Sequence, residues 1–341
     1  MYNVLLTPYR PDLGTIFHRQ TKRHSLVSLD GRYRFFIGGS ADMPTPDFWV
    51  VQGKGIRCPE TCRVAPQNTI LLTTEPSSVF HYPKSYVSQF GLACLCQEEC
   101  NLPNVKHGPA ILPWFIGYSE DHDGHITGWS LDYDALKAMP TPAKPKLLSV
   151  ITSNKAFTQG HIDRLRFVER LKTHFGDSLD VYGHGFNDFD DKWNVLSQYK
   201  YHIVIENSSQ LYYWTEKMSD CLLAETFAFY HGCLNIADYV PREAYEPINI
   251  KNPDEAIRII DESIANNRYE RSVAALKEGK RLMLDKYNIF EYVASLCDGL
   301  DATLPKQEVT LQPCRSGKDF RNLWQYSVGR KLYELKYKLF K

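Results

Sequence analysis

Short apolar runs alternate with helical stretches along most of this chain, and that alternation restricts the fold more than any other feature. In the first half, buried strands rich in Val, Ile, Leu and Phe are predicted at Val4–Leu6, Arg34–Ile37, Phe48–Val51 and Ile70–Thr74. Repeated strand–helix–strand order predicts parallel sheets covered by helices. The segment Met139–Lys146 (MPTPAKPK) holds three prolines in eight residues and is predicted to be an interdomain linker.

The same alternation returns after the linker. Strands are predicted at Leu147–Ile151, Leu179–Tyr182, Tyr201–Ile205 and Leu234–Ala237. Helices are predicted from a cap at Ser153-Asn154 to about His174, and again over Lys217–Tyr230. A chain of 341 residues has room for two domains of ordinary size. We therefore expect an α/β protein of two Rossmann-like domains, residues 1–140 and 147–300, followed by a tail of residues 301–341.

Composition narrows the class of protein further. The formal net charge is zero, which argues against a general nucleic-acid binder. The first residues lack a signal peptide, and no apolar run approaches the roughly 18 residues of a membrane helix, so we expect a cytoplasmic protein. Reduced thiols are the favoured interpretation of the nine cysteines, because Cys58, Cys62, Cys94, Cys96 and Cys100 do not have the spacing of paired zinc knuckles.

The most polar cluster in the sequence, ENSSQLYYWTEK at Glu206–Lys217, directly follows a predicted buried strand. Thr215 can cap a helix whose first turn carries Glu216 and Lys217. A helix N-terminus offers unpaired N–H groups and a partial positive charge, which suits a diphosphate, and Lys217 adds a full charge. Glu216 can accept hydrogen bonds from sugar hydroxyls. The alternative from spacing alone is a capped surface helix with a solvated Glu-Lys pair.

This cluster resembles the signature of the α1,3/α1,4-fucosyltransferases, family 10 of the glycosyltransferases. The register from Glu206-Asn207-Ser208 through Tyr213 to Thr215-Glu216-Lys217 matches without a gap, and Gly232 falls at a family glycine. The similarity is good over residues 147–260, where further matching positions are Ser153-Asn154, Arg164, Leu171 and Asp180–Gly183. Two positions depart from the family, which has proline at Ala228 and an aromatic residue at His231.

The resemblance implies a GT-B type architecture whose second domain binds a nucleotide sugar, GDP-fucose. It implies that the donor is held by Glu206, Asn207, Tyr213, Glu216, Lys217 and Arg164. Arg164 is selected over the nearby Arg166 and Arg170 as a diphosphate ligand, a role that suits a guanidinium because its fork binds two phosphate oxygens at once.

Glu75 follows the apolar strand at Ile70–Thr74, and Pro76 then turns the chain out of the sheet. The resemblance implies that this carboxylate is the catalytic base. Inverting transfer needs one group to take the proton of the acceptor hydroxyl as it attacks the anomeric carbon. A carboxylate partly desolvated in a domain cleft is expected to have a raised pKa.

We expect no essential metal and no cofactor. The run Asp188-Phe189-Asp190-Asp191 resembles an Asp-x-Asp metal motif of another glycosyltransferase architecture, but Arg164 and Lys217 can supply the positive charge, so a solvated loop is favoured. His161 and His184 have no partner at metal spacing.

The tail differs in character from the rest of the chain. Over Lys318–Lys341, seven basic residues stand against two acidic ones, with apolar side chains at helical steps. Such a C-terminal amphipathic helix can lie on an anionic membrane surface or pack back on the enzyme. The first alternative would make the protein peripheral on the inner face of the cell membrane.

Together these features predict a bacterial-type inverting fucosyltransferase. It would move fucose from GDP-fucose to a hydroxyl of an acceptor glycan, in the synthesis of a surface polysaccharide such as lipopolysaccharide. One alternative is an inverting transferase that uses a different nucleotide sugar, and another is a catalytically inactive protein that binds glycans or nucleotides.

Overall fold

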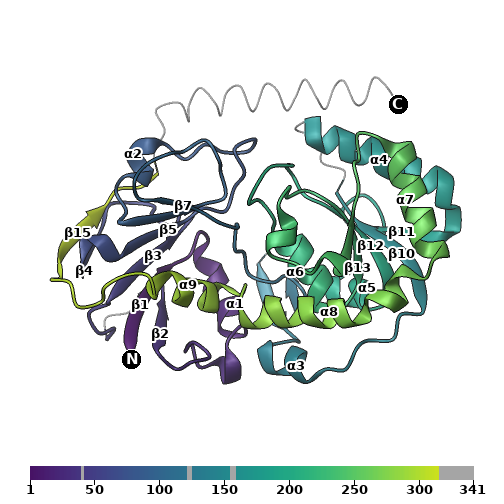
Figure 1. The fold of residues 1–341 in the computed structure, drawn as a ribbon. Helices are drawn as coiled ribbons and strands as arrows, with labels where there is room; N and C mark the ends of the chain where they lie inside the picture. Colours follow the sequence, from purple (N-terminus) through teal and green to yellow (C-terminus); the bar gives the residue numbers. More distant parts are fainter. Residues whose placement is uncertain (40–41, 121–124, 154–158, 315–341) are drawn as a thin grey trace.

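The computed structural model describes residues 1–39, 42–120, 125–153 and 159–314. These residues form two lobes that stand side by side, each built on one parallel sheet (Figure 1). The predicted amphipathic helix over residues 318–341 lies outside the described residues. Among the described residues, no helix is long and apolar enough to span a membrane.

The first sheet has six parallel strands in the order β2-β1-β3-β5-β6-β7. Their bounds are β1 Tyr2–Thr7, β2 Tyr33–Ile37, β3 Phe48–Gln52, β5 Thr69–Leu72, β6 Leu92–Leu95 and β7 Val105–His107. The short helices α1 Gly14–His18 and α2 Lys84–Val87 belong to the same lobe (Figure 1). All four strands predicted for this half are confirmed, because apolar side chains fill both faces of a sheet of this kind.

The second sheet has five parallel strands in the order β11-β10-β12-β13-β14. Its strands are β10 Lys146–Ile151, β11 Leu179–Tyr182, β12 Tyr199–Ile205, β13 Phe227–His231 and β14 Tyr245–Pro247. Its helices are α4 Gln159–Phe175, α5 Lys192–Leu196, α6 Glu216–Leu223, α7 Pro253–Ala265 and α8 Arg268–Asp285. The two sheets confirm the α/β fold of two Rossmann-like domains in a GT-B type arrangement.

Both sheets change the direction of their strand order beside the first strand, at β1 in one lobe and at β10 in the other. Ligands of open parallel sheets bind beyond the carboxyl ends of the strands at such switch points. Two short antiparallel pairs complete the fold, together with α3 Tyr133–Ala138 between the lobes. The pairs are β8 Tyr118–Glu120 with β9 Ile126–Trp129, and β4 Glu60–Val64 with β15 Gln307–Leu311.

Two predicted elements of the second half are wrong. The helix expected over Lys217–Tyr230 ends at Leu223, and the chain turns through Glu225, whose φ of 52° is left-handed, into β13. The side chains of Phe227–His231 are nearly all buried. A central strand buries side chains on both of its faces, whereas a surface helix buries only one, so these residues fit a strand better. The strand expected over Leu234–Ala237 is instead a loop and a 3-10 helix at Ile236–Asp238.

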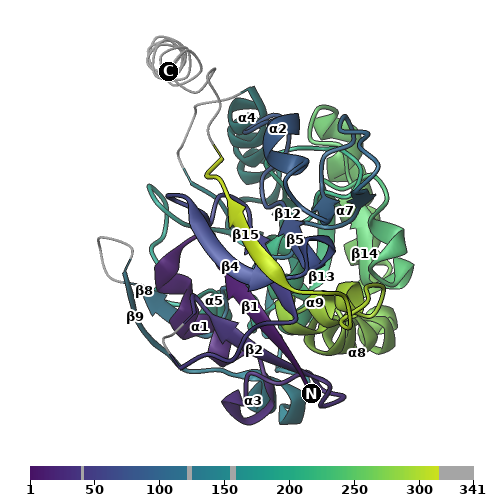
Figure 2. The ribbon, with the colours of Figure 1, turned by 90° about the vertical axis from the view of Figure 1, so that its left-hand side faces the viewer.

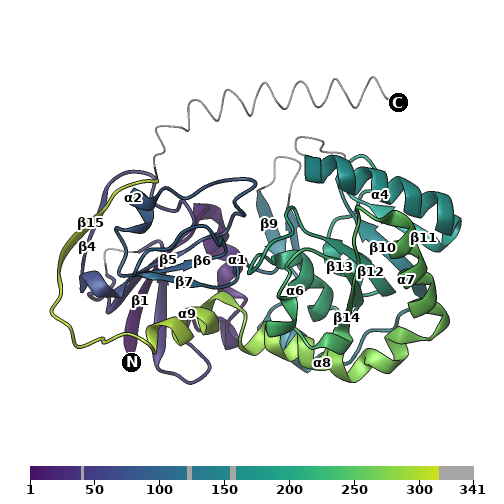
Figure 3. The same cartoon turned by 45° about the horizontal axis from the view of Figure 1, so that its top comes forward.

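The end of the described chain returns to the first lobe. Helix α8 runs along the lower side of the second lobe toward the first and leads into α9 Ile289–Cys297, which packs on the first sheet (Figures 1 and 3). Phe290 contacts Phe17 and Phe35 edge to face, with ring centroids 6.2 and 4.9 Å apart. Beyond it, β15 pairs with β4 on the outer side of that lobe (Figure 2).

Candidate active site

A cavity of about 750 Å³ opens at the carboxyl ends of β10, β11 and β12. Thr152, Ser153, Gly183 and Asn207 line it directly after those strands, and α6 contributes Glu216 and Lys217. The first lobe adds Val79 and Glu120, so the cavity lies between the two domains. Its size suits a small-molecule ligand, and its position is the switch point of the second sheet.

Helix α6 begins as its sequence predicts. The Thr215 side chain accepts a hydrogen bond from the backbone N–H of Lys217, and the backbone N–H and hydroxyl of Thr215 both donate to Glu206, at 2.8 Å each. The Lys217 ammonium forms ion pairs with Glu206 at 3.2 Å and with Glu216 at 3.3 Å. Glu206 is fully buried, so its role here is to hold the start of the helix and Lys217 rather than to contact a ligand directly.

The charges of this group support one another. Burial opposes ionisation of Glu216, but Lys217 and Lys192 outweigh it and lower its pKa, so this carboxylate stays ionised. Burial likewise works against Lys217, yet Glu206 and Glu216 raise its pKa. Burial raises the pKa of Glu206, only partly offset by Lys217. The site therefore presents an ionised carboxylate and an ammonium side by side, held in place before any ligand arrives.

Two glycines leave room for this arrangement. A Cβ on Gly232 would lie 2.5 Å from Cγ of Glu206 and from the hydroxyl of Tyr230, so only glycine lets the buried glutamate fit. Gly183 has a φ of 114°, and a Cβ there would lie 1.9 Å from the carbonyl oxygen of Thr152 at the cavity wall.

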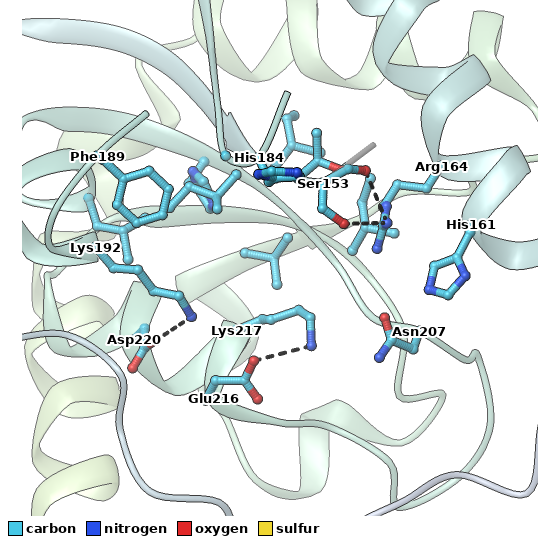
Figure 4. A pocket seen from close by; sticks show the side chains of 18 of the residues that line it. Ser153, His161, Arg164, His184, Phe189, Lys192, Asn207, Glu216, Lys217 and Asp220 are labelled. Atoms are coloured by element: carbon cyan, nitrogen blue, oxygen red, sulfur yellow. Dashed lines mark hydrogen bonds and ion pairs between the residues drawn. The ribbon is translucent and has the colours of Figure 1, made fainter. Parts of the chain in front are cut away.

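Arg164 projects from α4 into the same cavity, at the end opposite Lys192, with His161 and Asn207 nearby (Figure 4). It is buried, and its hydrogen bonds with the described residues are long, to the carbonyl oxygen and hydroxyl of Ser153 at 3.4 and 3.5 Å. Its Nε has no partner, and no described carboxylate pairs with it. A buried guanidinium without a counter-ion is an anion-binding group.

The competing arginines are placed elsewhere. Arg166 is exposed, and the exposed Arg170 pairs with Asp254. Of the three, only Arg164 lines the cavity.

Glu75 lies three residues after Leu72, the last residue of β5, and is half-buried. Its carboxylate makes no hydrogen bond or ion pair with another described residue, although Lys54, Lys217 and Glu216 are all within electrostatic reach. Desolvation raises its pKa, and the two lysines offset that only in part. Tyr9, at the carboxyl end of β1, lies within electrostatic reach of both Glu216 and Glu75.

Other residues singled out in the sequence are placed as follows. Asn207 lines the cavity, whereas Tyr213 is buried between the lobes against Cys96 and Ala110. Ala228 is fully buried in β13, and His231 makes a 3.2 Å contact to the carbonyl of Ile248. The two departures from the family pattern thus lie outside the cavity lining.

The acidic run after β11 does not act as a unit. Asp188 lines the cavity and Asp190 is exposed, but Asp191 is buried. Asp191 caps α5 by accepting from Trp193 N–H and also accepts from Gly117 N–H, both at 2.8 Å. The interpretation of the whole run as a solvated loop therefore misses a structural role for Asp191. The described residues contain no group of three or more His, Cys, Asp or Glu side chains placed to hold a metal ion.

Sequence reasoning missed several side chains that line the cavity. Lys192 and Asp220 form an ion pair of 3.0 Å beside Glu216, and the other carboxylate oxygen of Asp220 accepts from Phe115 N–H. The sequence does contain a signal for Asp220, because this residue follows Glu216 by four positions on one helix and so lies on the same face. His161 and His184, dismissed as metal ligands, also line the cavity.

Comparisons with known proteins agree with this geometry. Residues 141–262 match the family model described as glycosyltransferase family 10 (fucosyltransferase), C-terminal. Similar solved structures include an α1,3-fucosyltransferase with GDP, at 16% identity and TM-score 0.49, covering 85% of this chain and 92% of the other. The same enzyme type with GDP-fucose gives TM-score 0.47 at the same identity and coverage. The calicheamicin glycosyltransferase CalG4 gives TM-score 0.37 at 10% identity, covering 88% and 98%.

No curated protein matches by sequence search. The family match covers the second sheet, α4, α6 and the residues Arg164 and Glu206–Lys217 that build the cavity. Over residues 141–262, the chain is therefore similar to the C-terminal domain of the family 10 glycosyltransferases.

Proposed function

We propose that this protein is an inverting fucosyltransferase that uses GDP-fucose and an acceptor glycan. The observation that carries the proposal is that Arg164, a buried guanidinium that no described carboxylate pairs with, lines one interdomain cavity together with the Glu216–Lys217 pair. The carboxylate of Glu75 is not among the residues that line this cavity, but it lies within electrostatic reach of Glu216 and Lys217 and has no hydrogen bond or ion pair with a described residue. The first two suit a sugar diphosphate, and the third suits a proton acceptor.

In the proposed reaction, an acceptor hydroxyl attacks the anomeric carbon of fucose. A new C–O bond forms there while the bond from that carbon to the β-phosphate oxygen breaks, and the hydroxyl proton passes to Glu75. Arg164 and Lys217 stabilise the negative charge that grows on the departing GDP. Because Lys217 already faces two carboxylates, Arg164 contributes the larger uncompensated positive charge.

The acceptor would enter from the first lobe. Tyr9 is an aromatic residue with a hydroxyl within electrostatic reach of both Glu216 and Glu75, and an acceptor sugar must lie near both to reach donor and base. Lys54, whose ammonium lies 4.1 Å above the ring of Phe80, borders the same region.

A panel of nucleotide sugars tests the donor. A ligand that binds only the folded state raises the melting temperature, so GDP-fucose and GDP should stabilise the protein. The enzyme should also release GDP slowly from GDP-fucose, with water as acceptor. Stabilisation by UDP-sugars and none by GDP-sugars would rule out the GDP-fucose assignment and favour a different nucleotide sugar. Binding without any release of nucleotide would favour an inactive binding protein.

The proposal also includes a cellular setting, namely the cytoplasmic face of a bacterial membrane and a surface polysaccharide as product. It depends on the basic residues 318–341. Removal of Leu323–Lys341 should abolish binding to vesicles that contain anionic lipid and leave GDP release unchanged. Aggregation of the truncated protein would indicate that this segment packs on the enzyme instead.

A further inference from the structure

The loop between β12 and α6 belongs to the second lobe but contacts the first lobe. Neither the fold nor the proposed reaction by itself requires these contacts. Gln210, in the middle of this loop, donates from its side-chain amide to the carbonyl oxygen of Cys96 at 2.8 Å. Its amide oxygen accepts from the hydroxyl of Ser77 at 3.2 Å and from that of Ser208 at 3.3 Å. One side chain of the second lobe thus binds two separate segments of the first.

Both of those segments lead to Glu75. Ser77 is two residues after it in the chain. Cys96 donates from its thiol to the carbonyl oxygen of Glu75 at 3.4 Å, and the neighbouring Gln97 donates to the same oxygen at 2.9 Å. Cys96, which binds the backbone carbonyl of Glu75, is therefore itself bound by Gln210.

The residues that follow Gln210 also contact the first lobe and so hold Gln210 in place. Leu211 N–H donates to Glu98 at 2.8 Å, and the ring of Tyr212 stacks on His107 of the first lobe with centroids 5.3 Å apart. Tyr212 has a φ of 64°, a strained conformation for a tyrosine that its surroundings must maintain. Tyr213 is buried against Cys96. The loop reaches the first lobe through four consecutive residues, Gln210–Tyr213.

We propose that Gln210 is a positioning residue that sets the location of Glu75 relative to the donor. The loop starts at Asn207 in the cavity wall and ends at Thr215, which caps the helix carrying Glu216 and Lys217. The donor site and the base therefore belong to different lobes but are joined through this loop, in which Gln210 binds the two segments next to Glu75. This inference rests on the proposed role of Glu75 as base.

The test replaces Gln210 by Met, which keeps the length of the side chain and removes its three hydrogen bonds. GDP release from saturating GDP-fucose is measured with water as acceptor, together with the Kd for GDP. Turnover should fall about 10- to 100-fold, because a displacement of about 1 Å at the reacting centre costs up to about that much. The Kd for GDP should stay unchanged, and so should the turnover of the matched control Gln307→Met, at an exposed glutamine on β15.

A double variant separates positioning from general stability. In the Glu75→Gln background, Gln210→Met should produce no further loss of turnover, because the group being positioned is already gone. Ser77→Ala, which removes one of the three hydrogen bonds, should give a smaller loss in the same direction. Losses that multiply in the double variant, or a Gln210→Met enzyme with wild-type turnover, would overturn the inference.

The outcomes also separate this inference from the proposed function. If the wild-type enzyme turns over another nucleotide sugar, the GDP-fucose assignment fails and the same variants are compared with that donor. If Glu75→Gln retains full turnover while Gln210→Met loses it, Gln210 acts on something other than Glu75, and the inference fails on its own.

Discussion

The polar side chains at the strand ends of the two lobes differ in whether they have hydrogen-bond and ion-pair partners. In the second lobe, Glu206, Thr215, Glu216 and Lys217 bind one another through five hydrogen bonds and ion pairs of 2.8 to 3.3 Å. In the first lobe, the carboxylate of Glu75 has no hydrogen bond or ion pair with any described residue. One group of side chains is organised in advance, and the other carboxylate is left available.

This difference matches two chemical tasks. The diphosphate gains negative charge as it departs, and a prearranged set of donors stabilises that charge without reorganisation. A base must exchange a proton with a molecule that comes and goes, and a strong fixed partner would lower its pKa and its basicity. The comparison predicts that substitution of Glu75, or of a residue that positions it, alters turnover, and that substitution of a residue that binds the diphosphate alters affinity.

The largest effect is expected from Glu75→Gln. The amide keeps the size of the side chain but cannot take a proton, and general-base catalysis is typically worth about 10²–10⁴-fold. Turnover at saturating GDP-fucose should fall by that order, while the Kd for GDP measured by calorimetry stays the same. Glu308→Gln, on the exposed β15, is the matched control. Comparable weakening of GDP binding would break the proposed division between the lobes.

Arg164→Met should have the next largest effect, and on binding. A hydrogen bond to a charged group is worth about 1.5–3 kcal/mol, so the Kd for GDP should rise about 10- to 150-fold. The melting temperature of the free protein should not fall, because the substitution removes a buried charge that has no counter-ion. Arg166→Met, at an exposed position on the same helix, should leave the affinity unchanged. Equal affinities for both variants would remove Arg164 from the site.

A smaller effect concerns pH. The base works only when ionised, so turnover should fall as the pH drops through the pKa of Glu75, at a pH above the ordinary carboxyl value of 4.5 because burial raises that pKa. Lys54→Met removes a positive charge that favours the carboxylate, and the acid limb should move to higher pH. The shift should be small, because solvent screens the interaction of an exposed charge.

The salt dependence and a control sharpen this result. High salt should reduce the difference between Lys54→Met and the wild type, because the lysine is exposed. Lys84→Met, on α2, should leave the pH profile unchanged. An acid limb that moves to lower pH in Lys54→Met would contradict Glu75 as the titrating base.

The smallest effect is expected from chelation. If Arg164 and Lys217 neutralise the diphosphate, turnover should be retained in EDTA. Loss of turnover that manganese restores would instead assign a metal-binding role to Asp188, which lines the cavity.

Sequence reasoning predicted the parts of the molecule that depend on nearby residues. The apolar strands, the cap at Thr215 and the polar group after β12 follow from spacings of a few residues, and the structure has them. It did not predict the end of α6, where the left-handed Glu225 starts a strand of aromatic residues that also fit a helical pattern. A short apolar run fits either a strand or a buried helix, because burial in the fold, and not local preference, decides which of the two forms.

Long-range pairings were beyond reach for a different reason. Thr61 and Thr310 hydrogen-bond across 249 residues of sequence where β4 meets β15, and Gln210 binds Cys96 across 114. No local pattern encodes such partners. The burial of Glu206 and Tyr213 likewise depends on long-range packing. Their motif can therefore be recognised in the sequence, but how far each side chain is exposed cannot be predicted from it.

The return of α9 and β15 to the first lobe has a consequence for how the chain is made. Phe17 and Phe35 receive their partner Phe290 only after the sheet of the second lobe has left the ribosome. All strands of the second sheet, and helices α4 to α8, emerge before that point. The lobe that is synthesised first is therefore the one that must be completed last, contrary to the usual order in which domains mature from the N-terminus. Its apolar surface beneath α9 stays uncovered throughout translation of the second lobe.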